Sequence, residues 1–176
     1  RSAADVALAT QDMLRRARHL LPQARVAGVT LHPMIVRPHG RELIAGIAED
    51  PTFGPIILFG QGGKAVEIIR DRVVGLPPLN VMLAQDMIGR TRVARLLDAY
   101  RDTPAADRDA IAGVLVALAQ LSADIPEIRS LDLNPLLADE RGAIALAARV
   151  ELAPAEPLPR HGANARIAIA PYPRAL

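Results

Sequence analysis

The sequence predicts an α+β fold in which an antiparallel sheet carries helices on one of its faces. Two observations lead to this prediction. Apolar residues form short extended segments between residues 25 and 74 and again between 128 and 152, separated by Pro- and Gly-rich turns. Between residues 80 and 123 the apolar spacing changes to the helical period. The 176 residues, 51% of them apolar and 2% aromatic, suffice for one domain with an aliphatic core.

The first part of the chain is expected to contain a helix and then a hairpin. Residues 2–21 show the apolar stripe of an amphipathic helix, with Ser2 or Asp5 as its N-cap. Segments 25–36 and 42–48 read as two strands around a turn that contains Pro and Gly. These two strands would therefore pair with each other.

The remaining elements show either the pattern of an extended strand or the helical spacing of apolar residues. A turn cluster at 50–55 and a glycine-rich loop, Gly60–Gly63, separate extended segments, whereas the middle of the chain is helical in pattern. The segments expected to be strands are 56–59, 65–74, 128–138 and 143–152, and those expected to be helices are 80–88, 90–99 and 106–123.

The chain after residue 152 has a different composition. Recurrent prolines exclude a helix over most of it, and only residues 166–170 have the pattern of a short strand. We therefore expect a division into a folded domain, residues 1–152, and a Pro-rich linker or arm, residues 153–176, that leads toward another domain. Because the chain begins at Arg1 without a methionine, we interpret it as a piece of a longer protein.

Composition excludes several classes of function. The absence of cysteine excludes disulfides, thiolate metal sites and a cysteine nucleophile. Lys64 is the only lysine, and 21 basic residues stand against 19 acidic ones without a dense basic tract, which argues against a nucleic-acid partner. No apolar run reaches membrane-spanning length. We expect a cytoplasmic protein with neither nucleic acid nor membrane as its partner.

The sharpest chemical signal is the block Leu131-Asp132-Leu133-Asn134-Pro135. On a strand, Asp132 and Asn134 point to one face, while the two leucines point to the other. Two oxygen-bearing side chains on one face suit a hard cation such as Mg²⁺, which takes a few protein oxygens together with phosphate. The same pair could also face solvent or cap a turn, and composition alone favours this plainer interpretation.

The register of the last hairpin identifies what faces this block. A turn of two or four residues gives one register, in which Asn134 faces Ala147 and Asp132 faces Arg149. This register predicts a cross-strand ion pair between Asp132 and Arg149. A three-residue turn would shift the pairing by one residue and exchange these partners.

Five short segments have a recognisable pattern and occur in the order in which one known family has them. They are Gly28–Met34, Arg41–Gly46, Asp50–Pro55, Gly60–Glu67 and Asp132–Leu136. Together they resemble the ATP-grasp region of the ADP-forming acetyl-CoA synthetases and, more distantly, the β subunit of succinyl-CoA synthetase. The resemblance covers residues 28–152. A Phe-Gly-Pro turn, a glycine-rich loop followed by a glutamate, and the Asp-Leu-Asn-Pro block carry its specificity in combination.

The resemblance implies the C-terminal subdomain of an ATP-grasp fold and a nucleotide site on it. The stretch from His32 onward would join the two ATP-grasp subdomains beside the adenine, and two glutamates would line the same cleft. Each of these has an alternative reading, as an ordinary core strand or as a solvated strand residue. The residues implied to bind the nucleotide are Pro33, Met34, Ile35, Val36, Glu42 and Glu67. The implied ligands of Mg²⁺ are Asn134 and Asp132.

One departure from the family pattern weakens this site. The last strand of the family carries an acid two residues before its arginine, as the second metal ligand, but Ala147 stands there before Arg149. Loss of a ligand should weaken Mg²⁺ binding, on which phosphoryl transfer depends. ATP and Mg²⁺ are therefore expected to bind weakly or not at all. The phosphate-binding lysine of the family would lie before Arg1, so the chain alone should not turn over ATP.

The tail adds a second resemblance. Residues 167–173 resemble the linker that joins such a module to a GNAT-type domain in bacterial protein lysine acetyltransferases, in which the synthetase-like part is typically non-catalytic and regulatory. The first hypothesis is such a regulatory subdomain. Its partners would be the N-terminal ATP-grasp half, CoA-binding domains and a C-terminal GNAT domain. The alternatives are part of an active ADP-forming acyl-CoA ligase and a structural interaction domain without a ligand.

Overall fold

The computed structural model describes residues 2–63 and 70–154. The chain divides into two compact units, an N-terminal unit, Arg1–Val36, and a sheet unit, Arg37–Leu176. The predicted short strand at 166–170 lies outside the described residues.

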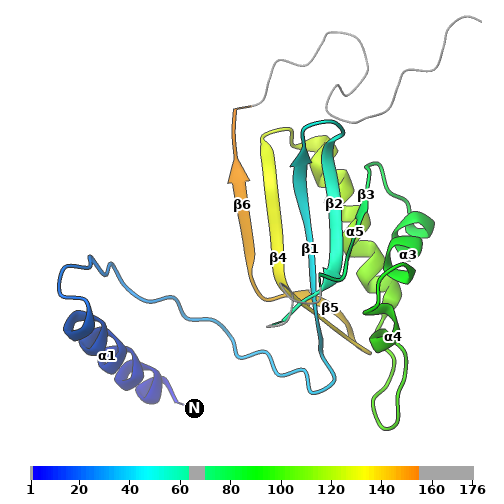
Figure 1. Ribbon diagram of the computed structural model, residues 1–176. Coiled ribbons are helices and arrows are strands. Elements are labelled where there is room, and N and C mark those ends of the chain that lie inside the picture. Colours follow the sequence, from blue (N-terminus) through cyan, green and yellow to red (C-terminus); the bar gives the residue numbers. More distant parts are fainter. Residues whose placement is uncertain (1, 64–69, 155–176) are drawn as a thin grey trace, which may run out of the picture. The chain divides into compact units, whose positions relative to one another are not determined.

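The N-terminal unit contains the helix α1, Ala3–Leu20 (Figure 1). Ser2 caps it, and the two residues expected as alternative caps act together. The Ser2 N–H donates to the Asp5 carboxylate at 2.8 Å, and the Asp5 N–H donates to the Ser2 hydroxyl at 3.2 Å. This reciprocal pair satisfies two of the backbone donors that a helix start leaves free. No residue of α1 is buried.

The predicted strand at 25–36 is wrong, because this segment has no regular secondary structure. Its expected partner is the strand β1, Arg41–Asp50, which does form. A strand has only two edges to pair along, and both edges of β1 are taken within the sheet unit. The expected hairpin therefore has no free edge to form on. The turn itself exists, since the Gly40 N–H donates to the Arg37 carbonyl oxygen at 2.9 Å.

The sheet unit is built on an antiparallel sheet with the order β3-β2-β1-β4-β5, in which β6 also pairs with β4 (Figure 1). The predicted strand at 65–74 appears only at its end, as β3, and residues 64–69 lie outside the described residues. The predicted strand at 143–152 is divided in two. The bounds of the other strands are Gly54–Gln61 for β2, Arg72–Gly75 for β3, Ile128–Asp139 for β4, Gly142–Ala145 for β5 and Ala148–Leu152 for β6.

The helical stretch between β3 and β4 forms α3, Val81–Gly89, α4, Ala94–Leu97, and α5, Arg108–Asp124. The outer two match the prediction, and the middle one is shorter than the expected 90–99. Side-chain caps begin both long helices. Asn80 accepts the Leu83 N–H at 2.9 Å, and Asp107 accepts the Ala110 N–H at 2.8 Å.

These helices cover one face of the sheet. Helix α5 packs against β1, β2 and β5, and α3 packs against β2 and β3. Figure 1 shows α5 behind the strands. The core between the layers is aliphatic apart from one aromatic residue, and its fully buried members include Leu43, Ile57, Phe59, Leu97, Ile111 and Leu115. The predicted α+β fold, with helices on one face of an antiparallel sheet, is confirmed.

The opposite face of the sheet, here called the open face, is covered by no helix of the described part of the sheet unit. Alternation along the strands decides which side chains it carries. On β1 the residues Leu43, Ala45 and Ile47 are buried on the helix side, which leaves Glu42 and Ile44 on the open face. Among the described residues, no helix is long and apolar enough to cross a membrane.

Candidate nucleotide site on the open face of the sheet

Strand β4 presents its polar pair as the sequence predicts. Asp132 and Asn134 are exposed on the open face, whereas Leu131 and Leu133 turn toward the helices. The predicted alternation is therefore confirmed.

A β-bulge lies at the end of this polar pair. Leu43 pairs with Leu136 and Ala45 pairs with Leu133, so two residues of β4, Asn134 and Pro135, face a single residue of β1. The extra residue reverses the alternation of β4, and for this reason Leu133 and Leu136 both point toward the helices. Bulges commonly re-aim side chains beside functional sites, and proline is tolerated here because ladder pairing is interrupted.

On its other edge β4 pairs with two strands, β5 and β6, and the gap between them lies beside the same residues of β4. Leu136 pairs with Ala145 on β5, and Leu133 pairs with Ala148 on β6, so the register of the hairpin is the same on both sides of the gap. Within the gap the Asn134 N–H donates to the Ala147 carbonyl oxygen at 3.3 Å. The prediction that Asn134 faces Ala147 is confirmed.

The register also places Asp132 opposite Arg149, as predicted. The expected ion pair between them is wrong. Arg149 instead pairs with Glu151, two residues along the same strand, at 2.9 Å. Both Arg149 and Glu151 are largely exposed, and exposed ion pairs differ little in free energy, so the nearer carboxylate on the same face suffices to redirect the guanidinium.

A groove of about 260 Å³ runs over the open face. Its floor is β1, and its charged groups are Arg72 from β3 on one side and Asp132 from β4 on the other. Gly46 keeps β1 and β4 close, because a Cβ at this position would lie 2.2 Å from the Leu131 carbonyl oxygen. The sheet thus places a cation and a carboxylate on opposite sides of an apolar floor.

The glycine-rich loop meets β1 at Glu42. The Gly62 N–H donates to the Glu42 carbonyl oxygen at 2.8 Å. Gly63 has a φ of +83°, and the Glu42 carboxylate occupies the space beside it, 2.8 Å from where a Cβ would be. The structure therefore brings Glu42 to this loop. Glu67, the second glutamate of the predicted site, lies outside the described residues.

The adenine-contacting residues of the predicted site belong to the N-terminal unit. Pro33, Met34, Ile35 and Val36 form no strand, which contradicts their expected role as a connecting strand. Met34 and Val36 are 80% and 70% exposed. Because both neighbours of β1 come from the sheet unit, no sheet edge of β1 is left to hold this segment in an extended conformation. Their nucleotide contact remains a prediction.

The oxygen ligands on the open face fit Mg²⁺ only if phosphate oxygens of a substrate supply further ligands. No group of three or more His, Asp or Glu side chains that could hold a metal occurs within residues 2–63 and 70–154. Asp132 and Asn134 supply oxygens from one strand, while the facing Ala147 supplies a methyl group. Mg²⁺ is commonly held by one or two carboxylates together with the phosphates of its substrate, so these residues suit a nucleotide-bound ion better than a free one.

Two neighbouring residues at the start of β3, Asp71 just before the strand and Arg72 on it, escaped the sequence reasoning. The Asp71 carboxylate accepts the Arg92 N–H at 2.8 Å and the Val93 N–H at 2.7 Å, which ties the start of β3 to the turn before α4. Arg72 follows and enters the groove. The signal that could have found it is the alternation of β3, in which Val73 is buried and its two neighbours are exposed.

A buried ion pair at the far end of β4 also escaped the sequence reasoning. The Asp139 side chain is 1% exposed and pairs with Arg37. Burial alone would raise the pKa of Asp139, but the Arg141 backbone N–H, 2.9 Å away, and the Arg37 guanidinium outweigh it and hold this pKa below its ordinary value. This pair ties the turn before β1 to the end of β4.

Comparison with known proteins places these features in a family context. Residues 1–152 match a family model described as an ATP-grasp domain. The chain is 35% identical over 144 residues to the β subunit of acetate–CoA ligase [ADP-forming] I from Pyrococcus furiosus, covering 82% of this chain and 61% of that one. It is 37% identical over 138 residues to acetate–CoA ligase [ADP-forming] I from Archaeoglobus fulgidus, covering 78% of this chain and 20% of the relative.

A solved structure extends the comparison to the fold. The dinucleotide forming acetyl-coenzyme A synthetase 1 of Ca. Korarchaeum cryptofilum, in complex with coenzyme A and Mg-AMPPCP, matches with a TM-score of 0.64 and 35% identity. The match covers 68% of this chain and 55% of that one. The chain thus spans between about a fifth and three fifths of the length of these relatives.

Proposed function

Because the chain belongs to the ATP-grasp domain family of the NDP-forming acyl-CoA synthetases, we propose that it forms part of the nucleotide-binding region of an ADP-forming acyl-CoA ligase. The observation that carries the proposal is the groove on the open face. It offers an apolar floor between Arg72 and Asp132, with Asn134 following on the same face. The rest of the ligase, including an N-terminal ATP-grasp half and CoA-binding domains, would lie in other parts of the protein.

The proposed roles follow from charge. Transfer of a phosphoryl group develops negative charge on its oxygens, and cations fixed in a site stabilise that charge. The Arg72 guanidinium would bind the phosphates directly, because its planar donors match phosphate oxygens. Asp132 and Asn134 would hold Mg²⁺, which offsets phosphate charge when it is bound. Glu42, next to the glycine-rich loop, would line the same cleft.

The first experiment tests the groove. We expect ATP, titrated calorimetrically into the 176-residue chain in the presence of Mg²⁺, to bind about tenfold more weakly to Arg72→Gln, since one charge-assisted contact to phosphate is lost. Arg90→Gln is the matched control, because Arg90 is exposed and pairs with Asp86 on α3, away from the groove. Equal affinities for the chain and both variants would contradict the assignment of the groove.

A second candidate function is favoured by Ala147. An exposed alanine faces Asn134 at the position where the family resemblance implies a metal-binding acid, which supports a non-catalytic, regulatory module of a larger enzyme such as a protein acetyltransferase with a GNAT domain. In this case the groove would still accept a nucleotide, while its affinity for Mg²⁺ would be reduced. The two candidates therefore differ in how strongly nucleotide binding depends on Mg²⁺.

Restoring the acid distinguishes the candidates. Under the regulatory proposal, ATP binding to the chain depends little on Mg²⁺, and Ala147→Asp gains a magnesium-dependent increase in affinity of about tenfold, because a carboxylate then faces Asn134. Ala148→Asp, one residue further and paired with Leu133, adds the same charge at a different register position and should give no such gain. Micromolar, magnesium-dependent binding by the unmodified chain would favour the active ligase instead.

A further inference from the structure

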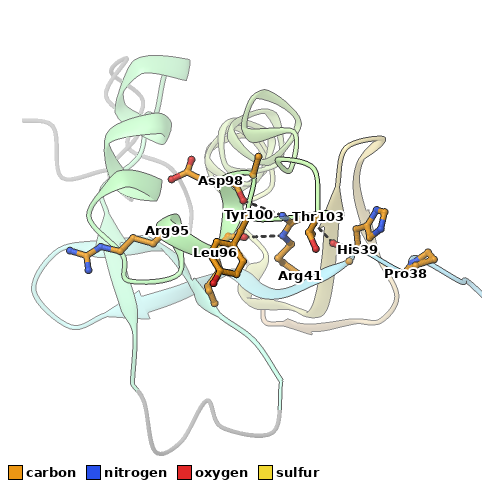
Figure 2. A pocket seen from close by; sticks show the side chains of 10 residues that line it. Pro38, His39, Arg41, Arg95, Leu96, Asp98, Tyr100 and Thr103 are labelled. Atoms are coloured by element: carbon orange, nitrogen blue, oxygen red, sulfur yellow. Dashed lines mark hydrogen bonds between the residues drawn. The ribbon is translucent and has the colours of Figure 1, made fainter.

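A second pocket, of about 510 Å³, lies where the turn before β1 meets the segment after α4 (Figure 2). It shares no lining residue with the groove on the open face. Its volume falls within the range of small-molecule sites, which are concave, mainly apolar and fitted with a few fixed polar groups. The proposed nucleotide function assigns nothing to it.

The floor of this pocket contains a guanidinium group fixed by backbone carbonyl oxygens. Arg41 donates to the carbonyl oxygens of Leu96 and His39, each at 2.9 Å, and to those of Asp98 at 3.3 Å and Pro104 at 2.6 Å. Figure 2 shows Arg41 behind Tyr100 and Leu96. Within the described part of the chain, no carboxylate lies within ion-pair distance of Arg41. The geometry of this cation is therefore set, while its charge is not neutralised by an acid.

The other charged groups of the pocket leave it positive. Asp98 is engaged by Arg108 at 2.9 Å, and His39 lies 3.5 Å from Glu140. Arg95 is exposed at the rim, and no acidic side chain of residues 2–63 or 70–154 pairs with it. Two guanidinium groups without acidic partners in one concave site favour an anionic occupant.

The rim of the pocket is apolar. Leu96 is 57% exposed and Tyr100 is 66% exposed, and both stand in front of Arg41 (Figure 2). Tyr100 is held in a tight turn, because its N–H donates to the Thr103 carbonyl oxygen at 2.9 Å and the Thr103 N–H returns a bond to Tyr100 at 3.0 Å. An aromatic ring on a fixed turn supplies contact area for a planar ligand at a small cost in conformational entropy.

We infer that this pocket binds a small organic anion with a planar apolar body, whose carboxylate or phosphate group lies toward Arg41, while Arg95 adds positive charge at the rim. The apolar body packs against Leu96 and Tyr100. Both head groups share the chemistry that guanidinium recognises, namely planar sets of oxygens with negative charge. A pocket of this volume accommodates a compact ligand, which favours it over an extended acidic peptide.

The test uses the 176-residue chain and three small probes, phenyl phosphate, benzoate and neutral benzyl alcohol, titrated by ¹H–¹⁵N NMR. We expect at least one anion to shift the backbone amides of residues 39–41 and 95–103 in a saturable way, and the pair of anions shows which head group is preferred. Arg95→Gln should weaken the anion about fivefold and leave benzyl alcohol unchanged. Tyr100→Ala should weaken all probes, and Arg90→Gln none.

Three results would overturn the inference. One is an equal effect of Arg95→Gln on charged and neutral probes, which would show that charge takes no part. Another is shifts confined to the groove residues 44–48 and 130–132. The third is the absence of saturable shifts with either small anion. If a glutamate-rich peptide, titrated in the same way, then gave saturable shifts, the pocket would be assigned to a protein segment instead.

Discussion

The N-terminal unit and the sheet unit gain their structure in different ways. Helix α1 has a complete capping box, yet none of its residues is buried, and Leu8 and Leu20 are 66% and 71% exposed. The sheet unit buries Leu43, Ile57 and Phe59 completely, through contacts between segments far apart in the sequence. Local signals thus suffice to start a helix, whereas the sheet depends on packing that only the whole unit provides.

The largest expected effect that tests this difference is in the core. Phe59→Ala should lower the free energy of unfolding of the sheet unit by about 3–5 kcal/mol, because it removes a fully buried ring and leaves a cavity. Urea unfolding measures this loss of stability. Because the chain has no tryptophan for fluorescence, the unfolding of each unit is followed by its NMR peak intensities.

The chain offers a matched control for this substitution. Phe53 lies in the turn between β1 and β2 and is 50% exposed, so Phe53→Ala should have a much smaller effect. If Phe59→Ala also reduced the helicity of α1, the separation of the two units in stability would be wrong.

A smaller effect is expected in acid. The pKa of Asp139 is lowered in the folded chain, so its contribution to stability is present above the unfolded value of about 3.9 and is lost as the pH falls through the folded pKa. The sheet unit should therefore lose stability below about pH 4. Asp139→Asn should flatten this part of the pH profile, whereas Asp102→Asn, at an exposed position, should leave it unchanged.

The N-terminal unit has its own acid-sensitive group. The Ser2 backbone N–H, followed by the Ser2 hydroxyl, lowers the pKa of Asp5, so the same sign applies and protonation of Asp5 weakens the cap of α1. Because no residue of α1 is buried, loss of its helicity in acid should not depend on Asp139. A single common acid transition that disappears in Asp139→Asn would contradict this independence.

The smallest effects compare two N-caps. Asn80→Ala should lower the stability of the sheet unit by about 1 kcal/mol, because α3 packs against the sheet and its unfolding is coupled to the core. Ser2→Ala should cost α1 a similar amount, seen only as reduced helicity by circular dichroism. A change in the urea midpoint of the sheet unit in Ser2→Ala would show that α1 is coupled to it.

Local patterns predicted the elements that stabilise themselves or alternate clearly. The helices α1, α3 and α5 and the faces of Asp132 and Leu133 follow from the spacing of apolar residues, and the cap of α1 follows from Ser2 and Asp5. The register of the last hairpin also followed, since a short turn allows few pairings and each one assigns every side chain to a face. For the same reason the sequence alone places Ala147 opposite Asn134, as the structure confirms.

The predictions failed where a distant partner decides the outcome. The segment 25–36 has the composition of a strand, but β1 takes β2 and β4 as its neighbours, and β4 lies more than 80 residues further along the chain than β1. The ion pair expected between Asp132 and Arg149 failed because Glu151 competes at closer range. Neither outcome is encoded in the spacing of residues within one segment.

The sequence by itself determined the types of most elements, the cap of α1, the polar face of β4 and the position of Ala147 opposite Asn134. Only the tertiary structure decided the strand order, the bulge at Asn134 and Pro135 against β1, and the joining of Arg72 and Asp132 across one groove. The physical reason is the range of the interactions. Caps and alternation act within a few residues, whereas a shared sheet face is built from strands that meet only when the chain has folded.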